Sequence, residues 1–300
     1  MLFPLDQVEQ YLQGIFASLE RDSSTLRWPD HGGQSTLSVD AVDAAAPGAA
    51  AISEVVTLTH RSREYSGLSV RACSELNRYA AMGLLMAGAN NAPGLWISKV
   101  GIAARDQSDA VRLYAPLLCG QASIMGWHSQ CLARGRYQAD PAQSPLAGGG
   151  EPARVDQSEF AALQASDEHA GLKGVLLPGS YTVQLPWPEA VAAGSTSLLG
   201  IRSTERHSLY GHGVLATLEL PLSLERNRAP ELVEHLNRWE LGHANLPPLL
   251  GAWCVGPRAP TFISFVPTLL CVPGLVPALA AWGRSRHHSV CQWIETEGTR

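Results

Sequence analysis

Cysteine and histidine are the residue types in this chain that could supply a nucleophile and a base. The chain contains six cysteines and ten histidines, and a thiol beside an imidazole is a common arrangement of a catalytic nucleophile. The best candidates for such a pair are Cys73 and Cys291. Cys73, however, shares one helical face with Val70 and Leu76, and Cys291 lies in a similarly apolar stretch. Because apolar surroundings raise the pKa of a thiol and keep it unreactive, we interpret both cysteines as core residues.

The histidine spacing does not indicate a metal site. His207, His212, His287 and His288 come nearest to a cluster, but they lack the His-x-x-x-His and Cys-His spacings of structural metal sites. His287 and His288 are better explained as favourable charge near the C-terminal end of a helix. The sequence also has no glycine loop for phosphates and no Gly-x-Ser-x-Gly motif. We therefore expect no catalytic residue, no metal and no cofactor.

The charge composition argues against a nucleic-acid partner. The net charge is −5, the isoelectric point is about 6.1, and the sequence has no dense stripe of basic residues. Lys99 and Lys173 are the only lysines, an arginine bias that we attribute to a GC-rich, bacterial genome. The N-terminus lacks the basic start and the continuous apolar stretch of a secretory signal, so the sequence predicts a cytoplasmic protein.

One apolar segment is long enough to span a bilayer. Residues 260 to 283 contain no charged side chain. Pro267, Pro273 and Pro277 would break a continuous helix there, whereas a strand, a turn and a helix starting near Pro273 would keep their backbone hydrogen bonds. The sequence therefore favours a strand and a helix over a membrane span.

The strongest pattern in the chain is a repeat at a spacing of about 160 residues. The corresponding segments are Leu26-Arg27-Trp28-Pro29-Asp30 with Leu185-Pro186-Trp187-Pro188-Glu189, Val56-Thr57-Leu58 with Ala216-Thr217-Leu218, and Leu76-Asn77-Arg78-Tyr79 with Leu236-Asn237-Arg238-Trp239. The three pairs occur in the same order, and a repeat of this length is a whole domain. At roughly 150 residues per domain, the length of the chain also suits two domains. We therefore predict two copies of one fold.

Each copy is predicted to be an α+β unit, an antiparallel sheet packed with helices in the order α-β-β-β-α-β-β-α. The first copy covers residues 1–135, the second covers residues 155–300, and the two form a pseudo-two-fold pair. Residues 136–154 are rich in proline and glycine and are predicted to be a linker. The apolar spacing predicts helices over residues 5–19, 68–87, 108–132, 156–168, 229–243 and 274–293. Strands are predicted at residues 25–28, 36–39, 52–59, 95–103, 181–187, 197–203, 213–220, 251–255 and 261–266.

This element order resembles that of the YbjN and type III secretion chaperone-like superfamily. The resemblance is carried by the two Trp-Pro-acid strands, the two Leu-Asn-Arg-aromatic helices and the Ser-Phe-Val-Pro strand before the last helix. It covers nearly the whole chain and implies that the two copies together imitate the homodimer of single-domain chaperones. It also implies a binder of protein segments without chemistry of its own. The tandem arrangement departs from the simplest pattern of the superfamily, which leaves open whether both copies bind.

The duplicated aromatic, arginine and asparagine residues are the predicted site for a protein partner. Arg78 and Arg238 could bind carboxylates or carbonyls of the other copy, which is the role we favour, or those of a bound peptide. Trp28 and Trp187 could cover the sheet edge by packing, or could anchor a guest segment there. The complete predicted site comprises Trp28, Trp187, Arg78, Arg238, Asn77 and Asn237.

We interpret the protein as a non-catalytic, chaperone- or adaptor-like protein that binds another polypeptide. The rival interpretation is an enzyme of unidentified class that uses a cysteine or histidine in the cleft between the copies. A third is a structural or self-assembling protein. The sequence leaves open the identity of the partner and whether the pair of copies dimerises further.

Overall fold

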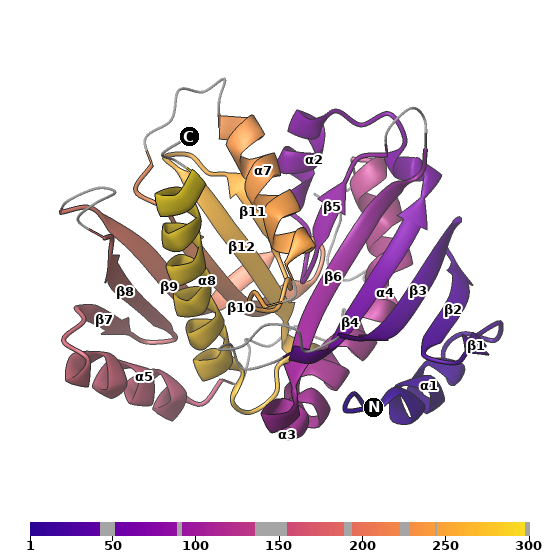
Figure 1. The fold of residues 1–300 in the computed structure, drawn as a ribbon, viewed down its shortest axis with the longest axis horizontal. Helices are drawn as coiled ribbons and strands as arrows, with labels where there is room; N and C mark the ends of the chain where they lie inside the picture. Colours follow the sequence, from indigo (N-terminus) through magenta and orange to yellow (C-terminus); the bar gives the residue numbers. More distant parts are fainter. Residues whose placement is uncertain are drawn as a thin grey trace.

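The chain folds into two antiparallel sheets of six strands each, with helices packed on both (Figure 1). The structure is a computed structural model, and it describes residues 1–42, 52–88, 92–135, 155–188, 194–222, 229–243 and 245–297. The predicted linker, residues 136–154, lies outside the described residues.

The first copy has the predicted α+β organisation, with one strand more than the predicted order α-β-β-β-α-β-β-α contains. The additional strand is β1, which consists of three exposed residues, two acidic and one basic, and has no apolar alternation to reveal it. Pairing with β2 alone defines it. The elements are α1 (Leu5–Gln13), β1 (Glu20–Asp22), β2 (Thr25–Asp30), β3 (Gly33–Ala41), β4 (Ile52–Ser62), α2 (Val70–Asn77), β5 (Leu84–Met86), β6 (Gly94–Ala103), α3 (Gln107–Asp109) and α4 (Ala115–Ala133).

The second copy repeats this organisation, including the additional strand. Here the extra strand is β7, which forms a hairpin with β8. The elements are α5 (Gln157–His169), β7 (Gly174–Leu177), β8 (Ser180–Pro186), β9 (Thr196–His207), β10 (Gly211–Glu219), α7 (Ala229–Gly242), β11 (Ala252–Val255), β12 (Pro260–Pro267) and α8 (Leu275–Glu297).

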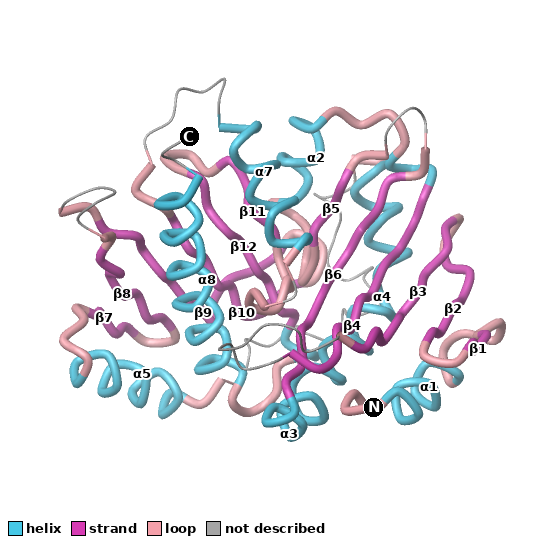
Figure 2. Tube along the Cα trace, in the orientation of Figure 1, coloured by secondary structure: helices cyan, strands magenta, loops and turns pink. Residues whose placement is uncertain are grey.

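The two sheets have the same strand order, which confirms the prediction of two copies of one fold. The first runs β1-β2-β3-β4-β6-β5 and the second runs β7-β8-β9-β10-β12-β11. Trp28 lies in β2 and Trp187 directly follows the corresponding strand β8, while Asn77 and Asn237 lie in the corresponding helices α2 and α7. The sheets lie side by side, with β5 and β11 toward the middle and with β1 and β7 at the two outer ends (Figure 2).

The prediction of a helix over residues 68–87 was wrong at its C-terminal end. Helix α2 begins after Ser69, whose side chain accepts a hydrogen bond from the backbone N–H of Ala72, and it ends at Asn77. Leu84–Met86 form the edge strand β5 instead. Met82 has a φ of 53°, a left-handed conformation that a continuing helix could not contain. Apolar spacing alone does not separate a helix from a short buried strand.

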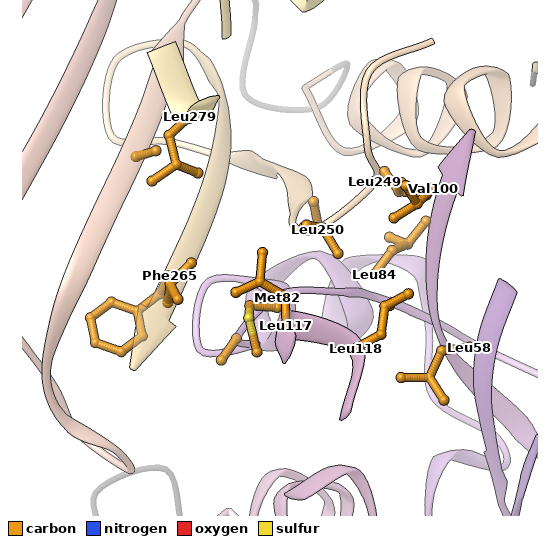
Figure 3. Packing of buried hydrophobic residues seen from close by; sticks show 14 of the residues in the cluster. Leu58, Met82, Leu84, Val100, Leu117, Leu118, Leu249, Leu250, Phe265 and Leu279 are labelled. Carbon is orange, nitrogen blue, oxygen red and sulfur yellow. The ribbon is translucent and has the colours of Figure 1, made fainter. Parts of the chain in front are cut away.

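The buried apolar side chains form one continuous core across both copies. Helix α4 packs on β2, β3 and β4, and helix α8 packs on β9 and β10. Leu250 and Phe265 of the second copy and Met82 and Leu117 of the first belong to this same core, and Figure 3 shows them with other members of it. The two copies therefore share a core, and neither is an isolated domain.

The apolar segment at residues 260 to 283 has the structure that its prolines predict. It forms strand β12, a short turn at Thr268–Leu270 and the beginning of α8. Of the helices in the described ranges, none is both long enough and apolar enough to cross a membrane.

Candidate functional site at the junction of the copies

Asn77 and Asn237 have the same structural role in the two copies. The amide of Asn77 donates to the carbonyl of Leu85 at 3.1 Å and accepts from its N–H at 2.6 Å. Asn237 makes the same pair of bonds with Trp253, at 3.0 and 2.8 Å. Leu85 and Trp253 lie in β5 and β11, the inner edge strands of the two sheets. Each asparagine therefore occupies the backbone groups that an added strand would need.

A second duplicated bond supports this equivalence. The hydroxyl of Ser98 in β6 donates to the carbonyl of Met82, and the hydroxyl of Ser264 in β12 donates to the carbonyl of Leu250, both at 2.5 Å. Both serines are buried. The segment before each inner edge strand is thus fixed to its sheet in the same way in both copies.

Replacing either asparagine by alanine is expected to lower the free energy of unfolding by about 1 to 3 kcal/mol, because a buried N–H and a buried carbonyl would lose their partners. Since the two side chains make the same bonds, Asn77→Ala and Asn237→Ala should have similar effects in urea unfolding. Asn245→Ala, at an exposed position, is the control and should change stability by less than about 0.5 kcal/mol. If only one of the two variants lowered the free energy of unfolding, the two asparagines would not have equivalent roles.

Trp28 and Trp187 pack in the core and are not available to a guest. Their exposed fractions are 0% and 5%. The ring of Trp28 stacks on Phe16 with the centroids 5.3 Å apart, and the indole N–H of Trp187 donates to the hydroxyl of Ser197 at 2.5 Å. Of the two roles that the sequence left open, packing is the one that their positions support.

Arg78 and Arg238 are both exposed, but their surroundings differ. Arg238 forms an ion pair with Glu234 one turn earlier in α7, with distances of 2.5 and 2.9 Å to the same carboxylate oxygen. Arg78 forms no ion pair with any described residue and lines a cavity together with Arg258. The expected bonds from these arginines to the other copy are not found among the described residues.

The two copies meet through α2 and α7, and a groove remains open between these helices. Helix α2 packs on α7 and also on β11 of the other sheet, whereas no comparable packing joins α7 to β5 in the described part of the chain. This departure from two-fold symmetry leaves a groove of about 350 Å³, hereafter the α2–α7 groove. Its walls are residues 68–70, 73, 74, 77 and 84–88 of the first copy and residues 233, 234, 237 and 238 of the second. The helices lie next to each other in Figure 1.

The α2–α7 groove is mainly apolar. Leu68, Val70, Leu84, Met86 and Val233 contribute to its walls, and the ion pair of α7 lies at its rim. Val70 is 38% exposed and so offers apolar surface to a partner. Such a groove can accept apolar side chains from a partner.

The structure gives neither candidate cysteine an activated thiol. Burial raises the pKa of Cys73, in the α2–α7 groove, to about 11. The thiol of Cys291 lies 3.5 Å from Nε2 of His287 within α8. Burial raises the pKa of Cys291 to about 11, and burial, with a contribution from His288, lowers the pKa of His287 to about 4. At neutral pH this pair is a thiol beside a neutral imidazole, without the charge separation that a cysteine nucleophile needs.

Lys99 joins the copies, and the sequence interpretation did not identify it. Its ammonium group donates to the carbonyls of Glu240, Leu241 and His243 at 3.2, 2.6 and 2.8 Å. These carbonyls are at the C-terminal end of α7, where a positive charge is favourable. The backbone of Lys99 also pairs with Leu249. The sequence did contain a signal for Lys99. It is one of only two lysines in the chain, and it lies within the otherwise apolar strand predicted at residues 95–103.

Two histidines, the half-buried His207 and the buried His128, also connect the copies. Nδ1 of His207 accepts from the N–H of Leu209 at 2.9 Å, so Nε2 carries the proton and donates to the carbonyl of Tyr79 at 2.9 Å. His128 of α4 bonds to the hydroxyl of Tyr210 across the junction. Burial lowers the pKa of His207 to about 4 and the pKa of His128 well below its ordinary value. Both imidazoles are therefore neutral at pH 7.

Among the described residues, no group of three or more histidine, cysteine or acidic side chains could hold a metal ion.

The outer edges of the sheets differ in their protection. Strand β1 consists of charged residues only, which discourage the addition of another strand. Strand β7 is uncharged, and Val175 and Leu177 are 60% and 58% exposed. The outer edge of the second sheet is thus a second apolar surface, distant in the strand order from the α2–α7 groove.

No protein-family model matches the chain, and no match was found among curated proteins or solved structures.

Proposed function

We propose that the protein is a non-catalytic, chaperone- or adaptor-like protein that binds an apolar segment of another polypeptide in the α2–α7 groove. The observation that carries the proposal is the groove itself, which is apolar, open and lined by both copies. A single copy would provide only one of its two helical walls.

The size of the α2–α7 groove favours a short segment over the face of a folded domain. A volume of about 350 Å³ lies at the small end of ligand pockets, which range from about 300 to 1,000 Å³. Two or three apolar side chains of a peptide would fill it, in the way that a groove between helices accepts the anchors of a bound segment. Exposed apolar side chains such as Val70 are the surface that this contact would remove from water.

Side-chain contacts would dominate such a complex, because the inner sheet edges are closed. Asn77 holds both outward-facing backbone groups of Leu85 in β5, which forms part of the groove wall. A guest cannot extend the first sheet there without displacing the amide of Asn77.

The resemblance of the element order to the YbjN and type III secretion chaperone-like superfamily supports the same function, since those proteins bind protein segments.

Three exposed valines allow a direct test of the proposed site. Val70 lies in the α2–α7 groove, Val175 lies in the β7 edge, and Val111 lies near neither and is 45% exposed. Peptides are selected on the full-length protein from a randomised displayed library, and a benzophenone amino acid is then placed at each valine in turn. We expect a selected peptide to crosslink at position 70 and not at position 111.

The matched substitutions provide the affinity measurement. Val70→Asp should weaken peptide binding about tenfold or more, because it places a charge where an apolar contact forms. Val111→Asp, a change of the same type elsewhere on the surface, should leave the affinity unchanged. Crosslinking at position 175 alone, together with unchanged affinity of Val70→Asp, would assign the contact to the β7 edge and refute the proposed site.

A further inference from the structure

A second cavity lies next to the α2–α7 groove and has a different chemical character. It has a volume of about 370 Å³ and lies between α2, the start of α7 and the turn that joins β11 to β12. Three arginines line it, Arg71, Arg78 and Arg258, together with the single acid Glu75. We refer to this cavity as the arginine pocket.

The arginine pocket has an excess of positive charge in a chain whose net charge is −5. Arg71 is paired with Glu75 at 3.2 Å. Arg78 and Arg258 form no ion pair with any described residue, and both are exposed. The pocket also includes Ala229 and Pro230, the first two residues of the 14-residue helix α7, where the positive end of the helix dipole adds to the charge of the arginines. Two guanidinium groups without an ion-pair partner in the described part of the chain, both in a concave site, are suited to carboxylates.

The position of the arginine pocket relates it to the α2–α7 groove. Ser74 of α2 lines both cavities, which therefore adjoin each other across this helix. We propose that the arginine pocket binds acidic side chains of the same polypeptide segment whose apolar side chains occupy the α2–α7 groove. This inference rests on the proposed function and defines its partner more closely, as a segment with an apolar block beside two or more acidic residues.

The test begins with the peptides selected on the full-length protein. Wild-type protein should enrich peptides that contain an apolar block next to aspartate or glutamate. The variant Arg78→Gln/Arg258→Gln should enrich peptides that keep the apolar block and lose the acids. Arg105→Gln/Arg202→Gln removes two exposed, distant arginines and is the control for net charge, so it should enrich the same peptides as the wild type.

Affinity measurements on one selected peptide then quantify the contact. Changing its acids to amides should weaken binding to wild-type protein about tenfold at low salt, and less at high salt, where exposed charges are screened. The same change should have almost no effect on binding to Arg78→Gln/Arg258→Gln. Inorganic phosphate is tested in parallel as a free anion and should compete with the acidic peptide.

The outcomes separate this inference from the proposed function. In one outcome Val70→Asp abolishes binding, but changing the acids of the peptide to amides weakens binding equally for wild-type protein and for Arg78→Gln/Arg258→Gln. The inference is then wrong, whereas the assignment of the α2–α7 groove as the binding site is supported. If phosphate binds with the same dependence on Arg78 and Arg258 but does not compete with any peptide, the pocket is a site for small anions and the inference is again overturned. If the library yields no peptide that depends on Val70, the proposed function fails, and the inference fails with it.

Discussion

Replacing Arg286 by alanine is expected to lower the free energy of unfolding by about 3 to 5 kcal/mol, because the change would leave a buried carboxylate without its cationic partner. Arg286 in α8 donates to both carboxylate oxygens of Glu240 in α7, at 2.8 and 3.0 Å. It also donates to the carbonyl of Pro248 at 2.9 Å, and its guanidinium lies 3.6 Å from the ring centroid of Phe262. The side chains of Arg286 and Glu240 are only 3% and 1% exposed.

The control for this prediction is a much less buried ion pair within α7. Arg238 and Glu234 are 66% and 29% exposed, and Arg238→Ala should cost less than about 1 kcal/mol because such pairs contribute little. The double variant Glu240→Leu/Arg286→Met should be more stable than Arg286→Ala, since it removes both charges at once. Urea unfolding followed by tryptophan fluorescence measures all three. A loss below about 1 kcal/mol for Arg286→Ala would show that water reaches the pair.

The buried pair also supports one wall of the proposed binding site. Glu240 accepts a hydrogen bond from the indole N–H of Trp253 at 2.6 Å, and Asn237, one turn earlier in α7, fixes the backbone of Trp253. Helices α7 and α8 and strand β11 are thereby held in one arrangement. Because Val233 and Asn237 of α7 line the α2–α7 groove, loosening this network should also weaken peptide binding.

The sequence predicted the fold well because its main signals are local. Proline and glycine positions and apolar periodicity predicted five of the six strands of the second copy and its three helices to within a few residues. The duplicated Leu-Asn-Arg-aromatic motif placed Asn77 and Asn237 in corresponding helices. The misses have local causes too, since β1 and β7 are defined by pairing with their neighbours, and the segment after Asn77 has apolar spacing that suits either a helix or a strand.

The site was harder to predict because its contacts join residues far apart in the chain. Arg78 was singled out by its place in the repeat, but the arginine pocket also needs Arg258, which lies in the turn between β11 and β12. The tryptophans were conspicuous as large aromatics, yet burial removes them from the surface. The α2–α7 groove depends on how α2 packs against β11, and periodicity within one helix carries no information on that contact.

Lowering the pH from about 6.5 to 4 is expected to destabilise the protein progressively through three histidines that are buried or half-buried. Burial lowers the pKa of His60, His207 and His287 to about 4 in the folded state, whereas a histidine of the unfolded chain has a pKa of about 6.5. Between these values the unfolded chain binds protons that the folded chain does not, so stability rises with pH throughout this window. The stability that these neutral histidines contribute is present in full above pH 6.5 and falls as the pH approaches 4. Below pH 4 the loss levels off.

His207 is one histidine whose protonation should also loosen the junction of the copies. Its contribution to the acid loss should be on the order of 3 kcal/mol by pH 4, because a proton on Nδ1 would displace the N–H of Leu209 that this nitrogen now accepts. The variant His207→Gln should be less stable than wild type at pH 7 but should lose stability less steeply toward pH 4. Leu209→Ala removes a buried, non-titrating neighbour and should lower stability with the wild-type pH dependence. Urea unfolding at pH 7, 6, 5 and 4 gives these curves, and parallel curves for wild type and His207→Gln would rule out this role for His207.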